Sequence, residues 1–516
     1  MLTSAIVTRP GFDAEEFENA YRAADFDRCR LLIESRDAYD AVLAGALLAI
    51  RERRYTQVIA DLSEVPKTSI EALAARDVLL GAALALTRDY AAGSRLLERA
   101  LSDMKMDGAW YYEALYYRGL VAWMRQDHSA AQASGMEQLG ASDPNNRGRG
   151  RILLSWVALR RGEILRQVDE LQKALDEFET AEVPDQFLRA NALVTLALLC
   201  RELPLHDIND RVRAMFETLP WTSSLRLERF HVTRLLAAID ELAGNELSAF
   251  AGFKNAARLA PSEYWSVLCF LDRAMLAKNT GEMAFAAEQL QEAHEIAQRV
   301  SWNEATGEER AALLVLAELF AYGDPVIAEQ YLARFRTLGN SVIPILSYGT
   351  DPRVKGFEAY SQGIARLRLG DTGEGQAALT QAWSIFEDFN YAWRAALCAH
   401  ALFEATQDRR WIQRAARKID PWPHSWIARR VAESTSSSVL RLGRVPPARR
   451  QVLELVRAGR RNSEIATVLG RSPNTVRNQL SQLFATFNVK SRAELVAALS
   501  TPVTPVTPLH QKRSSR

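Results

Sequence analysis

The sequence contains few residues of the kinds that build metal sites, disulfide frameworks or membrane spans. Its four cysteines stand alone at Cys29, Cys200, Cys269 and Cys398, without zinc-ligand or paired spacing, so we expect neither a metal site nor a disulfide framework. The longest apolar stretches, such as residues 190–200, run to about a dozen residues, whereas a membrane span needs about 20. The N-terminus also lacks the apolar core of a secretory signal. These absences predict a soluble protein of a reducing cytoplasm with no membrane segment.

Signals for β-strands and for catalytic sites are also nearly absent. Residues 370–377 have two glycines at the spacing of a phosphate-binding loop, but Gln376 and Ala377 stand where that loop needs Lys and then Ser or Thr. His294 and Glu295 begin like a zinc-protease motif, yet a glutamine replaces the second histidine. The remaining histidines are scattered. We therefore expect no enzyme activity, no cofactor and no metal.

The charge of the chain is nearly balanced overall, but it is unevenly distributed. Lys plus Arg number 64 and Asp plus Glu number 63 in the 516 residues. Residues 441–516 hold 14 of the basic residues and only 3 of the acidic ones, which leaves 50 basic and 60 acidic residues in 1–440. This segregation predicts a polyanion-binding module at the C-terminal end of a body that does not bind polyanions.

Apolar residues recur at helical spacing from about residue 15 to 430, and small residues recur within this pattern at fixed offsets. From Gly81, a second glycine follows at +12, a leucine at +16 and an alanine at +19. Ala237, Ala274 and Gly363 begin copies in which the +16 residue is also large and apolar. Two helices joined by a short turn approach closely only where their side chains are small. We therefore expect the residues at 0 and +12 to face each other, and the +16 residue to fill the gap to the next pair.

The spacing of these copies indicates a repeat array. Strong and weak copies begin near residues 46, 81, 119, 155, 237, 274, 316 and 363, and the long interval after 155 leaves room for a degenerate copy in 187–220. The pattern resembles the tetratricopeptide repeat, whose period is 34 residues. This resemblance implies an all-α fold, with an N-terminal tail at 1–14 and a tetratricopeptide-like α-solenoid of roughly nine pairs over 15–432. The alternative is an irregular α-helical domain.

A solenoid of this kind presents a concave face that takes a peptide, a protein partner or a small-molecule ligand, and the fold alone does not distinguish them. One segment, AWYYEALYYRG, is unusually aromatic. Its rings either line the groove or pack between helices, and the second interpretation is the commoner one. The residues concerned are Trp110, Tyr111, Tyr112, Tyr116 and Tyr117.

A polar stretch, ESTSSS at 433–438, predicts a linker over 433–445, followed by a small helical module at 446–500. We expect helices at about 447–457, 462–469, 473–487 and 492–499. Gly459 and Gly470 are placed to end the first two, Asn462 or Ser463 to cap the second, and Ser472 to cap the third. The expected inward residues are Val452, Leu453, Val456, Ile465, Ala466, Leu469, Val476, Leu480, Leu483 and Phe487. Residues 501–516 are predicted to be a disordered basic tail.

Two short helices joined by a tight turn, the second well capped, are typical of a helix-turn-helix, whose second helix enters the DNA major groove. Since the apolar residues of 473–487 face the core, Arg477, Asn478 and Ser481 lie on the opposite side. Arg and Asn are suited to guanine and adenine edges, so we expect these three to contact bases. Phosphate contacts, which position without specifying sequence, are expected from Arg460, Arg461, Arg471, Ser472, Thr475 and Lys490.

Several spaced blocks in this segment resemble the LuxR-type (GerE-type) helix-turn-helix of bacterial transcription regulators. The matching residues are Asn462, Glu464, Ile465, Ala466, Ser472, Thr475, Val476, Val489 and Arg492. The resemblance places base contacts at the same three positions as the reasoning above. The sequence departs from the usual family residue at Arg450, Arg461, Gln479, Thr486 and Asn488, where the family usually has Glu, Ser, His, Lys and Gly. These changes concern the surface, so they affect target sequence and affinity more than fold.

The resemblance also implies a homodimer, with Leu495, Val496 and Leu499 forming the dimer stripe. The expected partners are double-stranded DNA and the transcription machinery, on the nucleoid in the cytoplasm. Two functions follow from the sequence. The first is a DNA-binding transcription regulator whose helical repeats sense a ligand or partner. The second is a non-catalytic scaffold that docks partner proteins and touches DNA incidentally.

Overall fold

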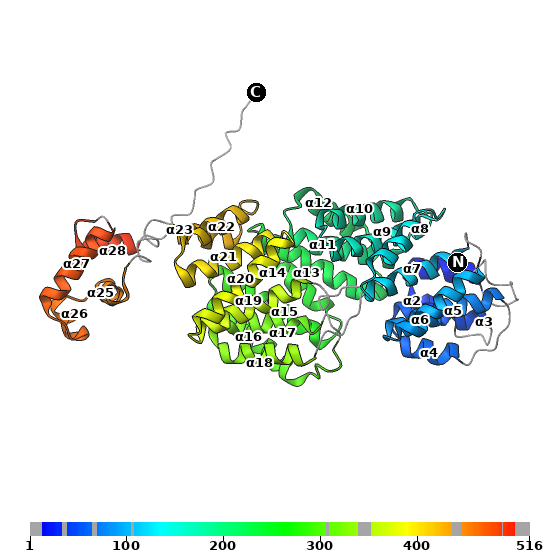
Figure 1. Ribbon diagram of the computed structural model, residues 1–516, viewed down its shortest axis with the longest axis horizontal. Helices are drawn as coiled ribbons and strands as arrows, with labels where there is room; N and C mark the ends of the chain where they lie inside the picture. The colour runs from blue at the N-terminus through cyan, green and yellow to red at the C-terminus, as the bar shows by residue number, and fades with distance from the viewer. Residues whose placement is uncertain are drawn as a thin grey trace, which may run out of the picture. The chain divides into compact units, whose positions relative to one another are not determined.

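The computed structural model in Figure 1 is helical throughout the part of the chain that it describes, namely residues 13–33, 39–63, 70–104, 108–305, 309–338, 352–435, 445–487 and 489–500. The predicted all-α fold class is confirmed. The chain divides into two compact units, residues 1–398 and 399–516. Across the described residues, no helix combines the length and the apolar character needed to cross a membrane.

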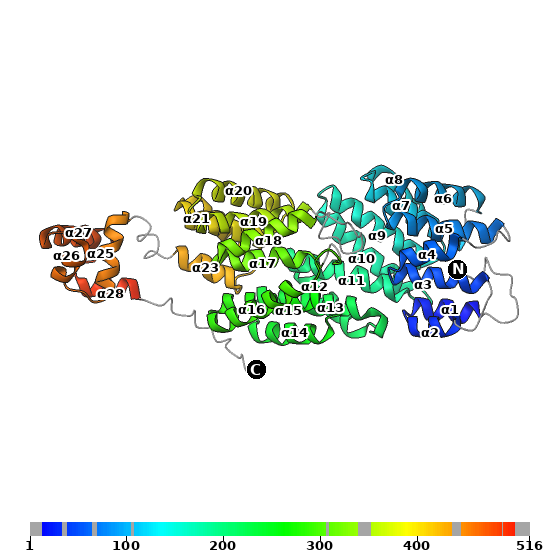
Figure 2. The same ribbon diagram turned by 90° about the horizontal axis from the view of Figure 1, so that it is seen from below.

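The first unit is an array of helix pairs, of which the described residues contain ten. Their first helices pack on one another from pair to pair, as α3, α5, α7 and α9 do, and Figure 2 shows the pairs following one another along the array. The pairs are α1 (Ala14–Arg22) and α2 (Phe26–Ile33), α3 (Tyr39–Arg51) and α4 (Tyr55–Ser63), α5 (Ile70–Leu86) and α6 (Tyr90–Asp103), α7 (Ala109–Met124) and α8 (His128–Gln138), α9 (Pro144–Arg160) and α10 (Ile164–Thr180), α11 (Gln186–Glu202) and α12 (His206–Thr218), α13 (Arg226–Leu242) and α14 (Glu246–Leu259), α15 (Glu263–Thr280) and α16 (Met283–Arg299), α17 (Ala311–Gly323) and α18 (Pro325–Leu338), α19 (Pro352–Arg368) and α20 (Thr372–Asp388). A short 3₁₀ helix, η2 (Ser223–Leu225), precedes α13.

The glycines at offsets 0 and +12 meet across their helix pairs as predicted. A Cβ added at Gly93 of α6 would lie 2.7 Å from the carbonyl oxygen of Gly81 in α5. The same holds in α19 and α20, where a Cβ at Gly375 would lie 3.0 Å from the carbonyl oxygen of Gly363. The residue at +16 differs from the expectation. Leu97 and its counterpart in α20 pack against the glycine of their own pair, so they fill that crossing rather than only the gap to the next pair.

Most of the turns between paired helices share one backbone geometry. Two positions before the second helix begins, the backbone is left-handed, with φ of 79° at Arg88, 66° at Gln126 and 91° at Gly370. In these turns the next residue is an aspartate that caps the second helix, as Asp89 does by accepting from the backbone N–H of Ala92 at 3.0 Å. A turn of fixed length and shape keeps the two helices of a pair in register.

The array differs from the predicted roughly nine pairs at its start. The pair α1–α2 precedes the first copy expected near residue 46, and the degenerate copy expected in 187–220 is an ordinary pair, α11–α12. The extra pair lacks the small residues at fixed offsets and is instead held by aromatic packing, with the ring of Tyr21 in α1 stacked 6.3 Å from that of Phe26 in α2. A search for small residues therefore does not detect it.

This first pair also contacts a distant part of the same unit. The Thr222 hydroxyl donates to the carbonyl of Ala24 at 2.7 Å, and the backbone N–H of Phe26 donates to Ser224 Oγ at 3.2 Å. The ring of Phe26 lies 6.0 Å from that of Phe187 in α11. These contacts join α1–α2 to α11 and η2, so the first six pairs form a turn that closes on itself.

The aromatic segment on α7 mostly packs inside the array. Trp110, Tyr111, Tyr116 and Tyr117 are all buried, which favours the packing interpretation for this segment. Tyr116 and Tyr117 additionally border an internal cavity of the closed turn, described below. Packing between helices therefore describes all four residues, and two of them also border this cavity.

Beyond α21 (Ala392–Thr406), which spans the division between the units, the second unit contains α22 (Arg409–Ile419), α23 (Trp426–Thr435), α25 (Pro447–Arg457), α26 (Asn462–Leu469), α27 (Pro473–Phe487) and α28 (Arg492–Ser500). Helix α23 extends three residues into the segment predicted as a linker over 433–445. Residues 436–444 of that linker, residues 1–12 of the predicted N-terminal tail and the predicted tail at 501–516 lie outside the described residues.

Candidate nucleic-acid interface

Helices α25 to α28 surround a small apolar core of their own. The predicted inward residues are buried in it, with the exception of Leu469, which is half-buried against its edge. Two further residues, Val445 and Leu495, complete the core. The four helices begin and end within one residue of the predicted bounds. This agreement follows from strong local signals, because apolar spacing, glycines and a Ser-Pro start all lie close together in the sequence.

The backbone at both predicted glycines has the left-handed geometry that ends a helix. Gly459 has φ of 77° and Gly470 has φ of 61°. After Gly470, the backbone N–H of Arg471 donates to the carbonyl of Ala466 at 2.9 Å, which closes α26 and directs the chain into α27. Ser472 caps α27 as predicted, because its Oγ accepts from the backbone N–H of Thr475 at 3.1 Å.

The three residues predicted to contact bases are all exposed on α27. Their side chains point away from the core, because the adjacent residues Val476 and Leu480 are buried in it. An exposed Arg and Asn on the first turns of a well-capped helix present a guanidinium fork and a side-chain amide at the surface. Side chains of these two types can form hydrogen bonds with base edges in the major groove.

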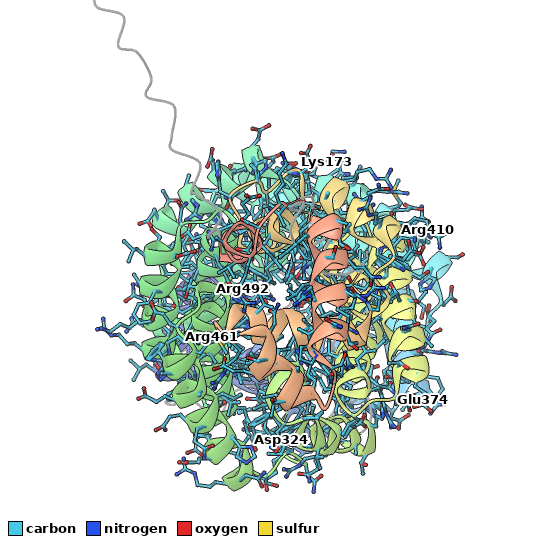
Figure 3. The ribbon with its side chains drawn as sticks, turned by 90° about the vertical axis from the view of Figure 1, so that its left-hand side faces the viewer. Lys173, Asp324, Glu374, Arg410, Arg461 and Arg492 are labelled. Carbon is cyan, nitrogen blue, oxygen red and sulfur yellow. The ribbon has the colours of Figure 1, made fainter. Side chains whose placement is uncertain are left out.

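The residues predicted to contact phosphate divide into exposed and internally bonded groups. Arg460, Arg461 and Lys490 are exposed, and Figure 3 labels Arg461 on this module. Arg471 is half-buried and donates from Nη1 to Gln479 Oε1 at 2.8 Å, so its guanidinium is held along α27. The remaining two, Ser472 and Thr475, are exposed but share a hydrogen bond of 2.8 Å between their hydroxyls.

The start of α26 differs from the expectation that Asn462 or Ser463 caps it. The cap residue is Arg461, whose backbone N–H donates to Glu464 Oε2 at 2.8 Å. The Asn462 side chain is used elsewhere, because its Oδ1 accepts from Arg492 Nη1 at 3.1 Å. Arg492 also donates to the carbonyl of Arg460. Helix α28 therefore holds the turn that presents Arg460 and Arg461.

The residues predicted to form a dimer stripe do not share one environment. Leu495 is fully buried in the core of the module, so its side chain is not available to a second subunit as the module stands. Val496 is half-buried and packs against the same core. The side chain of Leu499 lies outside the described residues.

Sequence reasoning overlooked two residues near this surface. Asn474 is exposed on the first turn of α27, one turn before Asn478, and the spacing of four residues from Asn478 could have indicated it. Arg450 donates from Nε to the carbonyl of Val445 at 2.9 Å. It stabilises the entry into α25, although the sequence identified it only as a departure from the family residue.

Residues 448–499 match the family described as bacterial regulatory proteins, luxR family. The resemblance of this segment to a LuxR-type helix-turn-helix is thereby confirmed. The match covers the whole four-helix module and no part of the repeat array. No curated protein matches the sequence.

Solved structures similar to the chain are helical-repeat proteins. They include a Rap protein complexed with competence and sporulation factor, at 14% identity over 81% of this chain and 99% of that chain, with a TM-score of 0.40. The apo form of RapI has 11% identity over 77% of this chain and 99% of that chain, with a TM-score of 0.38. The structure of phAimR has 10% identity over 77% and 97%, with a TM-score of 0.34.

Proposed function

We propose that this protein is a sequence-specific DNA-binding transcription regulator that reads the major groove with α27. The observation that carries the proposal is the exposure of Arg477, Asn478 and Ser481 on one capped helix of a module that matches the luxR family. In this function Arg477 donates to a guanine and Asn478 pairs with an adenine, while Ser481 contacts a neighbouring base edge. Asn474 adds a fourth polar group on the same side.

The basic residues around α27 supply affinity that does not depend on sequence. Arg460 and Arg461 precede α26, Arg471 precedes α27, and Lys490 precedes α28. Each arginine or lysine that approaches a phosphate releases counterions, so binding weakens as salt rises. Ser472 and Thr475 act as phosphate donors once their mutual hydrogen bond is exchanged for one to DNA.

We assign the repeat array to sensing, in the cytoplasm and on the nucleoid. A ligand or protein partner bound to the array regulates transcription only if its affinity differs between two states of the protein. The module acts as a homodimer on DNA and contacts the transcription machinery, with Val496 and Leu499 as the dimer residues that remain after the burial of Leu495. The family match favours a regulator over an enzyme.

The test is selection of bound duplexes from a random-sequence pool by the full-length protein. The wild type should enrich one motif, and the double variant Arg477→Ala/Asn478→Ala should lose that enrichment while it stays folded. Loss of each base contact costs about 1–3 kcal/mol of discrimination. Gln451→Ala, an exposed change on α25, is the matched control and should select the wild-type motif.

If the wild type enriches no motif, or if the double variant enriches the same motif as the wild type, the proposal is wrong. The scaffold function predicts that result, because DNA contact is incidental to it. Under that alternative the double variant would keep its protein partners and its cellular activity.

A further inference from the structure

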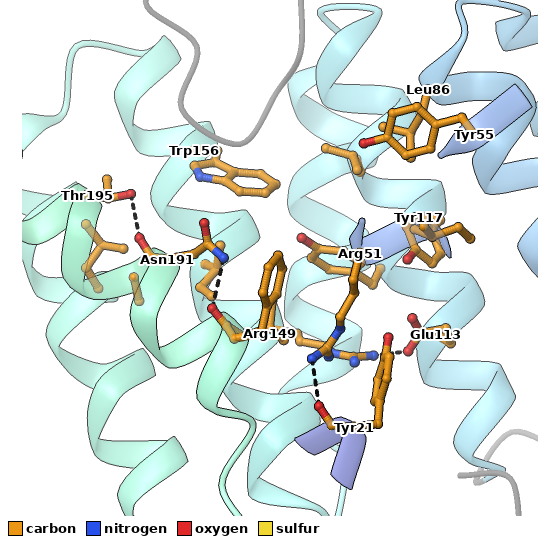
Figure 4. A pocket seen from close by; sticks show the side chains of 18 residues that line it. Tyr21, Arg51, Tyr55, Leu86, Glu113, Tyr117, Arg149, Trp156, Asn191 and Thr195 are labelled. Atoms are coloured by element: carbon orange, nitrogen blue, oxygen red, sulfur yellow. Dashed lines mark hydrogen bonds and ion pairs between the residues drawn. The ribbon is translucent and has the colours of Figure 1, made fainter. Parts of the chain in front are cut away.

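The closed turn of the first unit encloses a cavity that the DNA-binding module does not explain. Its wall is built by the first helix of each of the first six pairs, α1, α3, α5, α7, α9 and α11, with one residue each from α4 and α10. Contacts between α1–α2 and residues 222–224 complete the enclosure. Figure 4 shows side chains from these helices facing one space. A cavity lined by six consecutive repeats is a place where a ligand would touch many of them at once.

Two arginines and one glutamate border this cavity, and Asp185, just outside its wall, supplies the second negative charge that balances them. Arg51 pairs with Asp185, and Arg149 pairs with Glu113 and lies 3.6 Å from Asp185. The guanidinium groups hold the pKa of Asp185 below its usual value, although burial opposes this. Two cations and two anions leave no net charge for a ligand to neutralise. A charged ligand would therefore be buried without a partner, which is costly.

Two buried polar atoms in the wall have no hydrogen-bond partner among the described residues. One is Asn191 Oδ1, whose side-chain Nδ2 donates to the carbonyl of Phe187 at 2.8 Å while the oxygen is unpaired. The other is Arg149 Nε. Asn191 is 7% exposed and Arg149 is 3% exposed. An unpaired buried polar atom is unfavourable, and a ligand removes this cost if it supplies the missing donor or acceptor.

The size and the remaining wall indicate what kind of ligand fits. The cavity has a volume of about 60 Å³, which is room for roughly four to six water-sized groups at about 10–15 Å³ each. Most of its wall is aromatic or aliphatic, and Trp156 and Tyr117 contribute rings to it. One face of Tyr21 is already covered, because the Arg51 guanidinium lies 3.8 Å from its ring centre. A flat five-membered ring that carries one N–H donor and one ring-nitrogen acceptor suits this space.

We propose that the central cavity binds a small uncharged five-membered aromatic ring with one N–H donor and one ring-nitrogen acceptor. Its donor pairs with Asn191 Oδ1, its acceptor takes the Arg149 Nε–H, and its ring packs against Trp156. This proposal specifies the ligand class for the sensing role proposed above and rests on that role only for its link to DNA. Binding itself does not depend on DNA, so the two proposals fail separately.

The experiment uses the full-length protein with pyrazole and 1,2,4-triazole as uncharged probes and acetate as the charged comparison, followed by calorimetry and ligand-observed NMR. Pyrazole or 1,2,4-triazole should bind saturably and acetate should not. Asn191→Leu should weaken binding about tenfold, because one hydrogen bond to a buried group is lost. Ala192→Leu, which adds three carbons at a fully buried position of the wall, should abolish it.

Gln167→Leu is the matched control, since Gln167 is also a buried amide with an unpaired oxygen but does not border the cavity. It should bind the probes as the wild type does. If Ala192→Leu fails to fold, Asn191→Leu and Gln167→Leu decide the matter. Failure of both uncharged probes to bind, equal binding by Asn191→Leu and the wild type, or binding only by a mixed-sequence pentapeptide library would each overturn the proposal. Effects of the probes on duplex affinity test the sensing role independently.

Discussion

Arg492 illustrates how one side chain prepares a surface that it does not itself form. It donates to the carbonyl of Arg460 and to Asn462 Oδ1, and thereby fixes the turn before α26. The exposed arginines of this turn are then displayed on a rigid support and lose less side-chain entropy on binding a phosphate. The polar side chain of Asn462, expected to cap a helix, is committed to this bond instead.

The first prediction concerns the salt dependence of binding to a non-specific duplex. Arg460→Ala removes one exposed cation, so the slope of log K against log salt should become shallower by about 1. Fluorescence anisotropy across a series of KCl concentrations measures this slope. Gln451→Ala should leave the slope unchanged, and an unchanged slope for Arg460→Ala would exclude a phosphate contact at this position.

A second prediction arises from Glu228 on α13, which is 3% exposed. Burial raises the pKa of this carboxyl from 4.5 to about 7, with Arg53 opposing the shift. The folded protein therefore binds more protons than the unfolded chain between these values. The resulting stability is present below pH 4.5 and is lost as pH rises through 7, by roughly 3 kcal/mol. From pH 4.5 to pH 8, Glu228→Gln should therefore gain roughly 3 kcal/mol of stability relative to the wild type, as measured by denaturant unfolding of both proteins.

One turn along α13, His231 has the opposite dependence. Burial and the nearby positive charge of Arg234 lower the pKa of His231 from 6.5 to about 3. The stability that this neutral histidine contributes is present above pH 6.5 and is lost as pH falls. The Glu228→Gln variant should therefore keep the acid-side loss of the wild type. If its stability still fell between pH 4.5 and pH 8 as in the wild type, the assignment to Glu228 would be wrong.

At the scale of the elements, the two helices of a pair can approach closely because glycines without side chains lie where they cross. Gly81 and Gly93 bring the backbones of α5 and α6 so close that a methyl group at Gly93 would lie 2.9 Å from Ala85 Cβ. Gly373, at the start of α20, has nothing within 4 Å of the corresponding position. Gly93 and Gly373 therefore differ in the space available for an added methyl group.

The third prediction compares alanine at these two glycines. Gly93→Ala should destabilise the protein by about 1–3 kcal/mol, because the pair must separate to admit the methyl group. Gly373→Ala should be neutral or slightly stabilising, because alanine favours a helix and meets no neighbour. Thermal and denaturant unfolding measure both. Equal effects of the two changes would mean that helix propensity, and not the close approach, explains the repeat of small residues.

Small residues at fixed offsets predicted most of the helix pairs, while the turns that join those pairs were not predicted. The backbone is left-handed at Arg88 and Gln126, which is uncommon for residues with a side chain. Because neither residue is a glycine, the sequence does not mark these turns. The aspartates that follow, such as Asp89 and Asp127, are visible in the sequence and cap the second helices. Asp followed by a helical apolar pattern was the signal that could have located these turns.

At the scale of the whole molecule, the C-terminal module has an apolar core of its own, which should allow it to fold independently. Its buried residues contact one another across α25 to α28. The fourth prediction is that residues 436–516, expressed alone, fold cooperatively and bind duplex DNA with an affinity that falls as salt rises. Circular dichroism with denaturant and anisotropy titrations check both parts. An unfolded fragment, or one that ignores DNA even in dilute salt, would mean that the module needs the rest of the chain.

The sequence by itself determined the helical class, the repeat of small residues and the helix-turn-helix. These depend on contacts between residues near one another in the chain, where spacing, glycines and caps act locally. The tertiary structure alone decided that α1–α2 closes onto α11 and η2, which partners Arg51 and Arg149 find, and that Leu495 is buried. Those outcomes depend on residues that lie 36 to 198 positions apart in the sequence or on which face of a short helix meets the core. No local pattern carries that information, because it arises only when the elements pack.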